Sequence, residues 1–295
     1  MNIVLATDEN YAIPTAVCIT SVFENHKNTT CKVYILTDSL SNKAVSMFTQ
    51  LQNYYHQTII IINVNLTLLN SFKATKRLPV QTYYRLVLPE YIKEDKVLYL
   101  DCDIVVHRNI LDLYNTNLDG YGCGVVEDQR ADDISLLNHL DLESGYFNAG
   151  VLLVNLSYWR EHNIQDKLLS YIHNNPEKCV YNDQDALNSV LHNNVKYLDY
   201  AYNFQAMWFY PKDQLMIKKE KWPLLFTAKK NPAIVHFTKE KPWHCECNHP
   251  LRNWFIEYAK LHDFVPFKRT HYYSLPYRIL MRLSNEVSKF AHNFR

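Results

Sequence analysis

Short apolar runs alternate with amphipathic segments along the N-terminal third of the chain. The apolar runs are short and rich in β-branched residues, which predicts buried strands, and the segments between them have the apolar spacing of helices. The predicted strands cover 2–7, 32–37, 58–64 and 96–100, and the predicted helices cover 12–26, 41–54 and 82–91. This alternation predicts an α/β fold with a mostly parallel sheet and helices on both of its faces.

Acidic residues follow two of the predicted strands. Asp8 comes after the first strand, and Asp101 comes directly after the fourth. Ligands of parallel α/β sheets bind beyond the carboxyl ends of the strands. We therefore expect Asp8 and Asp101 to face the same crevice.

The segment Asp101-Cys-Asp103 lies between the apolar runs 96–100 and 104–106. Two carboxylates so close together at the end of a buried strand are costly to desolvate and repel each other. A divalent ion such as Mg²⁺ or Mn²⁺ would remove both costs, and its affinity for phosphate predicts a nucleotide diphosphate as the other ligand. The alternative is that one aspartate caps the next element and the other is solvated. The motif alone does not decide between these interpretations.

Composition narrows the class of protein. A chain of 295 residues, 47% of them hydrophobic, can form one large α/β domain or two smaller ones. The net charge of +1 gives no indication of nucleic-acid binding, and with only 5 glycines the chain has no Gly-rich phosphate loop.

The sequence also bears on location. Its first residues lack the features of a secretory signal, and no apolar stretch is long enough to cross a membrane. The 7 cysteines have no framework spacing, so we expect free thiols in a reducing cytoplasm.

More polar residues lie at apolar edges in the middle of the chain. Asn148 stands in Phe147-Asn-Ala-Gly150, directly before the apolar residues 151–154, and Asn182-Asp-Gln-Asp185 opens a predicted helix over 186–191. Such side chains at the start of a helix usually act as caps. They could also hold sugar hydroxyls, but the spacing alone favours the cap.

Histidines occur in two contexts of interest. His236 ends the apolar segment 233–235. A lone histidine there is more often a hydrogen-bonded core residue than a ligand, although a manganese site would gain from one imidazole. The segment His244-Cys-Glu-Cys-Asn-His249 crowds its potential zinc ligands together without the distant second pair of a structural zinc site, so the spacing does not favour zinc.

Six segments, in this order along the chain, resemble glycosyltransferase family 8. They are Leu5-Ala-Thr-Asp-Glu-Asn10, Tyr83-Tyr-Arg-Leu86, Leu98-Tyr-Leu-Asp-Cys-Asp103, Phe147-Asn-Ala-Gly-Val-Leu-Leu-Val-Asn155, Asn182-Asp-Gln-Asp185 and His236-Phe with Lys241-Pro-Trp243. The nearest likeness is to the bacterial lipooligosaccharide α-galactosyltransferases, and glycogenin is a more distant relative. The resemblance implies a GT-A fold, which is a single Rossmann-like nucleotide-sugar-binding domain with a mixed sheet. It also implies a UDP-sugar donor, a Mn²⁺ ion (Mg²⁺ being possible) and retention of anomeric configuration.

The resemblance also implies roles for individual residues. The implied metal ligands are Asp101, Asp103 and His236. The implied donor-binding residues are Ala6, Asp8, Asn10, Tyr11, Arg85 and Lys241, with Asp8 and Asn10 on the uracil, Tyr11 stacked on it and Lys241 at the diphosphate. The implied catalytic pair is Asp183 and Gln184, beside the transferred sugar. Asp128, Asn148 and Asp185 are implied contacts of the donor sugar or the acceptor. The chain departs from the family at Thr238-Lys-Glu240, where relatives commonly carry a glycine near the phosphates.

Together these features predict a Mn²⁺-dependent retaining hexosyltransferase. It would move galactose (first choice) or glucose (second choice) from a UDP-sugar to a glycan or lipid-linked saccharide. Because an amide such as Gln184 is a poor nucleophile, same-face attack by the acceptor is favoured over a covalent intermediate. The alternatives are a catalytically silent UDP-sugar-binding or scaffolding protein of the same fold and a metal-dependent phosphotransferase.

The C-terminus has a separate pattern. We expect a catalytic domain over 1–265 and a basic, aromatic amphipathic tail over 266–295. A helix over 277–294 would gather apolar residues on one arc and basic residues opposite. The apolar arc is Ile279, Leu280, Leu283, Val287, Phe290 and Phe294, and the basic residues are Arg278, Arg282 and Lys289. This pattern suits an anionic membrane surface or a helix docked on the core. The resemblance favours the membrane, which would place the protein on the inner face of the cytoplasmic membrane.

Overall fold

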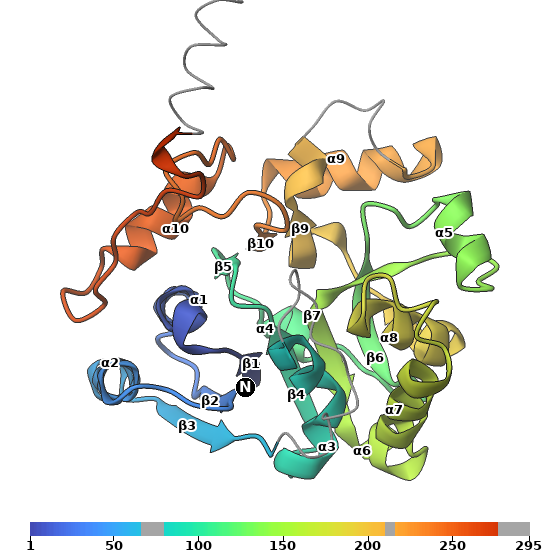
Figure 1. Cartoon of the computed structure of the whole chain (residues 1–295), viewed down its shortest axis with the longest axis horizontal. Coiled ribbons are helices and arrows are strands. Elements are labelled where there is room, and N and C mark those ends of the chain that lie inside the picture. Colours follow the sequence, from blue (N-terminus) through green and yellow to red (C-terminus); the bar gives the residue numbers. More distant parts are fainter. Residues whose placement is uncertain (66–79, 210–215, 277–295) are drawn as a thin grey trace, which may run out of the picture.

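A seven-stranded sheet runs through the centre of the described part of the chain, residues 1–65, 80–209 and 216–276 of a computed structural model (Figure 1). Its strands lie in the order β3-β2-β1-β4-β7-β6-β8. They are β1 (Asn2–Ala6), β2 (Lys32–Thr37), β3 (Thr58–Asn63), β4 (Lys96–Leu100), β6 (Cys123–Glu127), β7 (Phe147–Asn155) and β8 (Val195–Tyr197). Neighbours from β3 to β4 are parallel, whereas β7 is antiparallel to both β4 and β6. The expected α/β fold with a mixed sheet is confirmed.

A smaller three-stranded sheet brings distant segments together beside the first. It contains β5 (Ile104–Val106), β10 (Ile234–His236) and β9 (Phe204–Gln205). The antiparallel register of β5 and β10 pairs His236 with Ile104. This pairing places His236 next to Asp103, although the two residues are far apart in the sequence.

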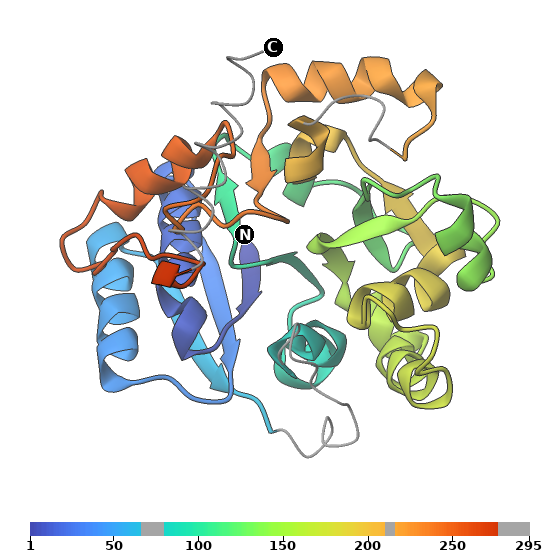
Figure 2. The same cartoon turned by 45° about the horizontal axis from the view of Figure 1, so that its top comes forward.

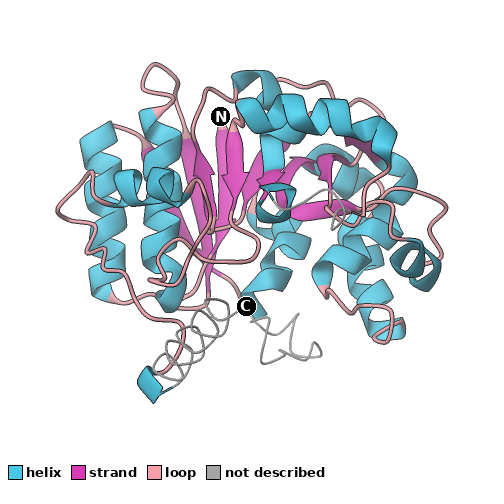
Figure 3. Ribbon diagram, turned by 90° about the horizontal axis from the view of Figure 1, so that it is seen from above, coloured by secondary structure: helices cyan, strands magenta, loops and turns pink. Residues whose placement is uncertain are grey.

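Helices cover both faces of the large sheet, as Figure 3 shows. Alternate residues of β1 enter different cores: Ile3 and Leu5 pack with α1 (Ala12–Glu24) and α2 (Asn42–Tyr55), and Val4 packs with the helices of the other face. That second face is covered by α6 (Leu156–Glu161), α7 (Ile164–Asn174) and α8 (Asp183–Leu191). Successive side chains of a strand point to opposite faces of the sheet, so an apolar strand contributes to both cores of the layered fold.

The remaining helices are short. They are α3 (Leu88–Tyr91), α4 (Leu111–Tyr114), α5 (Ile134–His139), α9 (Trp222–Lys230) and α10 (Arg252–Ala259), and the 3₁₀ turns η1 (Glu9–Tyr11), η3 (Val80–Val87), η4 (His192–Asn194), η5 (Tyr200–Asn203), η6 (Ala206–Phe209) and η8 (Lys219–Lys221). Figure 2 shows α10 on the same side of the sheet as α1 and α2.

The helix predicted over 82–91 is wrong in type over most of its length. The structure has a 3₁₀ helix, η3, followed by the single α-helical turn α3. Pro89 stands in the first turn of α3, and it lacks the N–H that an α-helix continuing from η3 would need to bond one turn back. The tighter η3 is the segment that carries Arg85.

Residues 266–276, which the sequence analysis assigns to the tail, lie against the catalytic body. Thr270 forms a parallel bridge with His244, and the Arg269 guanidinium donates to the His244 carbonyl over 2.6 Å. The predicted helix over 277–294 lies outside the described residues. Within the part of the chain that is described, no helix has the length and apolar character needed to cross a bilayer. All seven cysteines have free thiols.

Candidate active site

A cavity of about 510 Å³ opens at the carboxyl ends of β1 and β4. The structure brings twelve of the fourteen predicted site residues to its wall. These are Ala6, Asp8, Tyr11, Arg85, Asp101, Asp103, Asp128, Asn148, Asp183, Gln184, His236 and Lys241. Asp8 and Asp101 share one crevice, as the strand order requires.

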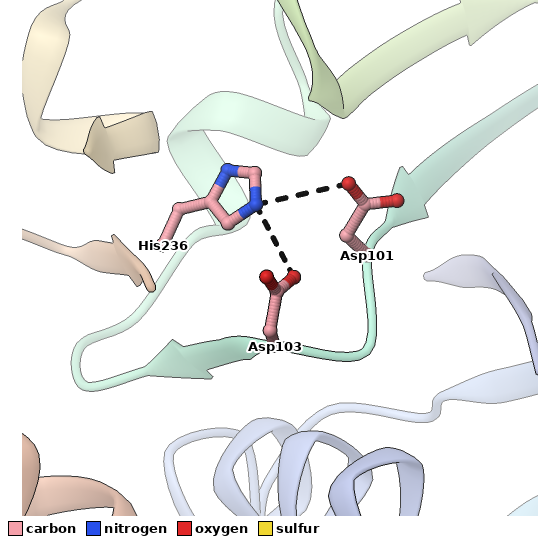
Figure 4. A group of neighbouring side chains, drawn as sticks. All are labelled: Asp101, Asp103 and His236. Carbon is pink, nitrogen blue, oxygen red and sulfur yellow. Dashed lines mark ion pairs between the residues drawn. The ribbon is translucent and has the colours of Figure 1, made fainter. Parts of the chain in front are cut away.

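Three side chains converge at one end of this cavity. His236 Nε2 lies 3.2 Å from Asp103 Oδ1 and 3.7 Å from Asp101 Oδ2 (Figure 4). The three ligand atoms all lie within 4.8 Å of one another. Neighbouring ligands of an ion bound at about 2.1 Å are roughly 3 Å apart, so the group fits a divalent cation. Two carboxylates and one imidazole suit Mn²⁺ or Mg²⁺.

Backbone contacts fix these ligands. The Asp101 N–H donates to the Gly150 carbonyl over 2.8 Å, and the Phe237 N–H donates to the Asp103 carbonyl over 2.9 Å. Gly150 also lets the imidazole approach the backbone: a Cβ added there would lie 2.2 Å from His236 Cε1 and 2.8 Å from Asp101 Oδ2. A glycine is therefore required at this position for His236 to reach the carboxylates.

Lys241 supplies positive charge to the ligand group. Its ammonium contacts Asp103 Oδ2 and donates to the Phe237 carbonyl over 2.8 Å. Burial opposes the charge of Asp103, but Lys241 and His236 outweigh it and hold the pKa of this carboxyl well below its usual range. Asp103 is therefore a carboxylate throughout the physiological pH range.

Arg85 joins the ligand group to the second polar group of the cavity. Its guanidinium lies 2.9 Å from Asp101 Oδ1 and 2.9 Å from Asp183 Oδ2, and it also donates to the Ala149 carbonyl. Burial raises the pKa of Asp183 to about 6, with Arg85 opposing the rise and the negative charge of Asp101 adding to it. The site thus carries more negative charge than its buried arginine neutralises.

Gln184 is held by hydrogen bonds at both ends of its amide. Its Oε1 accepts from the Ala149 N–H over 3.0 Å and from Asn148 Nδ2 over 3.3 Å. Its Nε2 therefore turns to the Tyr146 hydroxyl, 3.0 Å away, and to Asp128. Burial raises the pKa of Asp128, although Asn148 donates to it over 3.0 Å.

The loop after β1 forms the other end of the cavity. Asp8 accepts from the Tyr11 N–H over 2.9 Å and from Asn10 Nδ2 over 3.2 Å. The Tyr11 ring meets Trp243 edge to face at 5.5 Å, so the segment that carries Lys241 contacts this loop directly. Asn10 is exposed and does not line the cavity.

The cap interpretation of Asn182-Asp-Gln-Asp185 is wrong. Asn182 makes no side-chain cap bond to α8, and Asp183 pairs with Arg85 instead. Asp185 does not line the cavity: it is fully buried and accepts from the Tyr146 hydroxyl over 2.6 Å and from the Tyr181 N–H over 2.5 Å. These carboxylates serve tertiary contacts that local spacing does not show.

Tyr146 and Asn203 bond several of the predicted site residues but were not themselves predicted. Tyr146 bonds both Gln184 and Asp185, and its place directly before Phe147-Asn-Ala-Gly150 was an available signal. Asn203 bonds both His236 and Asn148, and nothing in its local sequence indicates this.

The segment 244–249 lies apart from the site. The side chains of His244, Glu246 and His249 contact different partners and do not converge on one point. His244 contacts Thr270, Glu246 pairs with His271, and His249 packs between the rings of Phe209 and Phe237.

Comparison with known proteins identifies the family. A family model described as glycosyl transferase family 8 matches residues 2–247. The chain belongs to glycosyl transferase family 8. It is therefore a retaining hexosyltransferase, and its fold is the GT-A fold of this family.

Individual relatives agree with this family 8 assignment. The chain is 26% identical over 299 residues to a lipopolysaccharide 1,2-glucosyltransferase of Escherichia coli, covering 99% of this chain and 85% of that one. It is 28% identical over 267 residues to a lipopolysaccharide 1,3-galactosyltransferase of Salmonella typhimurium, covering 87% and 77%. A crystal structure of the galactosyltransferase LgtC with donor and acceptor sugar analogues has a TM-score of 0.79 and 29% identity, covering 88% of this chain and 95% of that one.

The close approach at Gly150 gives a first prediction. Gly150→Ala should lower the free energy of unfolding by about 1–3 kcal/mol, as an overpacked core does, and should abolish Mn²⁺ binding because His236 or Asp101 must move. Electron paramagnetic resonance titration with Mn²⁺ and thermal unfolding measure the two effects.

Gly120→Ala is the matched control. Gly120 has a φ of +76° and open space around its Cα, so an alanine there costs roughly 1–2 kcal/mol of strain without touching the site. Unchanged Mn²⁺ binding in Gly150→Ala would show that the approach of His236 is not required.

Proposed function

We propose that this family 8 enzyme transfers a hexose from a UDP-sugar to a glycan or lipid-linked saccharide in a Mn²⁺-dependent reaction, with Mg²⁺ as a possible substitute. Galactose is the first choice of sugar and glucose the second. The observation that carries the proposal is that Arg85 joins the candidate metal ligands to the Asp183–Gln184 pair within one cavity. A group that could hold phosphate through a metal thus lies beside groups that could hold sugar hydroxyls. The lipopolysaccharide glucosyl- and galactosyltransferases among its relatives support the substrate class.

The donor would lie along the cavity, with its nucleotide at the loop after β1 and its sugar at Asp183 and Gln184. Asp8 and the backbone at Ala6 would receive the uracil, with the Tyr11 ring stacked on it, and Asn10 would reach it from the exposed loop after β1, outside the cavity wall. Asp101, Asp103 and His236 would hold the metal, which supplies positive charge to the diphosphate. Asp183 and Gln184 would contact the sugar, with Asp128, Asn148 and Asp185 supporting the sugar or acceptor side.

Breaking the bond between sugar and UDP builds negative charge on the leaving diphosphate. Lys241, whose ammonium contacts Asp103, would be less strongly attracted to this carboxylate once Asp103 also served as a ligand of a cation. Released from Asp103, Lys241 could donate to the leaving phosphate. In this way one lysine would neutralise Asp103 before the donor binds and the diphosphate afterwards.

Retention requires a protein nucleophile or attack from the face that UDP leaves. The Gln184 oxygen accepts hydrogen bonds from Ala149 and Asn148 and belongs to a neutral amide, so it is a poor nucleophile. The Asp183 carboxylate is paired with the Arg85 guanidinium, which makes it a weaker nucleophile. Same-face attack is therefore favoured: the acceptor oxygen bonds the anomeric carbon as the sugar–phosphate bond breaks, and the leaving phosphate takes the proton of the acceptor.

The decisive experiment measures UDP release from UDP-galactose and UDP-glucose with Mn²⁺ and a saccharide acceptor. Turnover of one or both with a glycosylated product supports the proposal. Release of orthophosphate without UDP, or no turnover of either donor, would reject it.

The metal role gives a second prediction. Asp103→Asn keeps the size of the side chain but removes a charged ligand, and should lower kcat/KM at least about a hundredfold because charge stabilisation by a metal contributes several kcal/mol. UDP binding, measured by calorimetry, should no longer strengthen on adding Mn²⁺. The exposed Asp112 on α4 is the control, and Asp112→Asn should leave both quantities unchanged. Full turnover of the wild-type enzyme in excess EDTA would falsify the metal role.

The amide gives a third prediction. Gln184→Ala should lower kcat by about 10–10³ and leave UDP affinity nearly unchanged, because the lost contact positions the sugar and not the nucleotide. Nuclear magnetic resonance of the product should show the anomeric configuration of the donor. An inverted product would be incompatible with the proposed mechanism.

We further propose that the C-terminal tail places the enzyme on an anionic membrane, at the inner face of the cytoplasmic membrane where lipid-linked acceptors would lie. Tyr272 and Leu275, at the end of the described residues, have exposed fractions of 69% and 61%. Exposed aromatic and aliphatic side chains next to basic residues are typical of membrane-surface segments.

The tail gives a fourth prediction. The double variant Tyr272→Ser, Leu275→Ser should bind anionic vesicles about tenfold more weakly because two apolar side chains are lost from the contact, and should keep its turnover of a soluble acceptor. Sedimentation with vesicles of anionic lipid measures the binding. Ile134 is the matched control, because its exposed fraction is 73% and its helix α5 lies on the other side of Figure 1 from the C-terminal segment. Ile134→Ser should bind vesicles normally. Equal binding by the double variant would remove the support for a membrane role.

A further inference from the structure

Asn203 lies at the end of η5, next to β9, and its side chain has no exposed surface. Its Oδ1 lies 3.0 Å from His236 Nδ1, and its Nδ2 lies 2.9 Å from Asn148 Oδ1. One buried amide therefore contacts a candidate metal ligand on one side and the sugar-side polar group on the other.

The direction of these hydrogen bonds follows from a backbone donor. The Gly150 N–H donates to Asn148 Oδ1 over 3.0 Å, so this atom is the acceptor of the Asn148 amide. Asn148 Nδ2 accordingly donates to Asp128 Oδ2. Asn148 Oδ1 can only accept from Asn203, which must present its NH₂ group there. The oxygen of Asn203 then faces the imidazole.

These hydrogen-bond directions determine which ring nitrogen of His236 carries a hydrogen. An amide oxygen only accepts, so Nδ1 of His236 must carry a hydrogen. In the neutral imidazole the lone pair is then on Nε2. Nε2 is the atom that lies 3.2 Å from Asp103 and 3.7 Å from Asp101. The nitrogen that can bind a cation therefore points at the carboxylates.

We propose that Asn203 is a positioning residue that holds His236 in its Nδ1–H tautomer, and that it thereby sets the metal affinity of the site and links His236 to Asn148. The proposal rests on the metal site of the proposed function. The partners that orient a metal-binding histidine typically change metal affinity by about 10–100-fold when they are removed.

The first measurement needs no variant. In metal-free protein with ¹⁵N-labelled histidine rings, at a pH high enough for the His236 ring to be neutral, the nitrogen shifts of His236, assigned by their loss in His236→Gln, should be those of the Nδ1–H form. The Nε2–H form in the wild-type protein overturns the proposal.

Two variants separate the two contacts of Asn203. Asn203→Leu removes both, so the imidazole should lose its fixed tautomer and Mn²⁺ affinity should fall by about 10–100-fold in a paramagnetic resonance titration. Asn203→Asp keeps an acceptor for Nδ1–H but faces Asn148 Oδ1 with an oxygen. It should retain the tautomer and lose less than about tenfold in Mn²⁺ affinity.

Asn155→Leu is the matched control. Asn155 lies at the far end of β7, where its amide bonds the carbonyls of Leu118 and Tyr121. It should lower thermal stability without changing the His236 tautomer or Mn²⁺ affinity. An unchanged tautomer and Mn²⁺ affinity in Asn203→Leu overturns the proposal, even where UDP release falls. If Asn203→Leu does not fold, a shift of Asn203→Asp to the Nε2–H form overturns it as well.

These readouts are independent of sugar transfer. A wild-type protein that binds Mn²⁺ with His236 in the Nδ1–H form, yet releases no UDP from either donor, would reject the proposed function and support the role of Asn203.

Discussion

The arrangement of the site depends on how a few buried cations are shared among more carboxylates. Arg85 lies between Asp101 and Asp183, and Lys241 lies on Asp103, so each cation occupies the space between elements that would otherwise repel each other. Burying an unpaired carboxylate is strongly unfavourable. Burial raises the pKa of Asp183, and the neighbouring negative charge of Asp101 adds to the rise. A divalent ion at the candidate ligand group would offset this imbalance.

The sheet topology determines which groups meet. β4 and β7 are antiparallel, so the end of β4, with Asp101, lies beside the beginning of β7, with Asn148 and Gly150. Had β7 continued the parallel pattern of β1 to β4, its beginning would lie at the opposite edge of the sheet. The reversal of strand direction therefore brings the candidate metal ligands at the end of β4 next to the polar residues at the start of β7, and the smaller sheet adds His236 from a third direction.

The sequence allowed prediction of the strands, the helices α1 and α2 and the carboxylates at the strand ends, because these depend on local periodicity and on one general rule for parallel sheets. The resemblance to a known family added His236, Gln184 and Lys241. The role of Asn203 was beyond reach, because its partners are distant in the sequence and meet it only through two strand registers. The 3₁₀ geometry around Arg85 was missed because the apolar pattern of 82–91 suits either helix, and Pro89 had to be weighed against it.

The contact between Lys241 and Asp103 also bears on the end of the catalytic cycle. Product release limits kcat in many enzymes, and the departure of a bound diphosphate would leave the cation that held it unpaired. In the proposed reaction the Lys241 ammonium has the Asp103 carboxylate to return to, because the pairing of β10 with β5 holds the two segments side by side. In the proposed reaction Asp103 would therefore pair with Lys241 again as the nucleotide product leaves, and this pairing would shorten the residence time of that product.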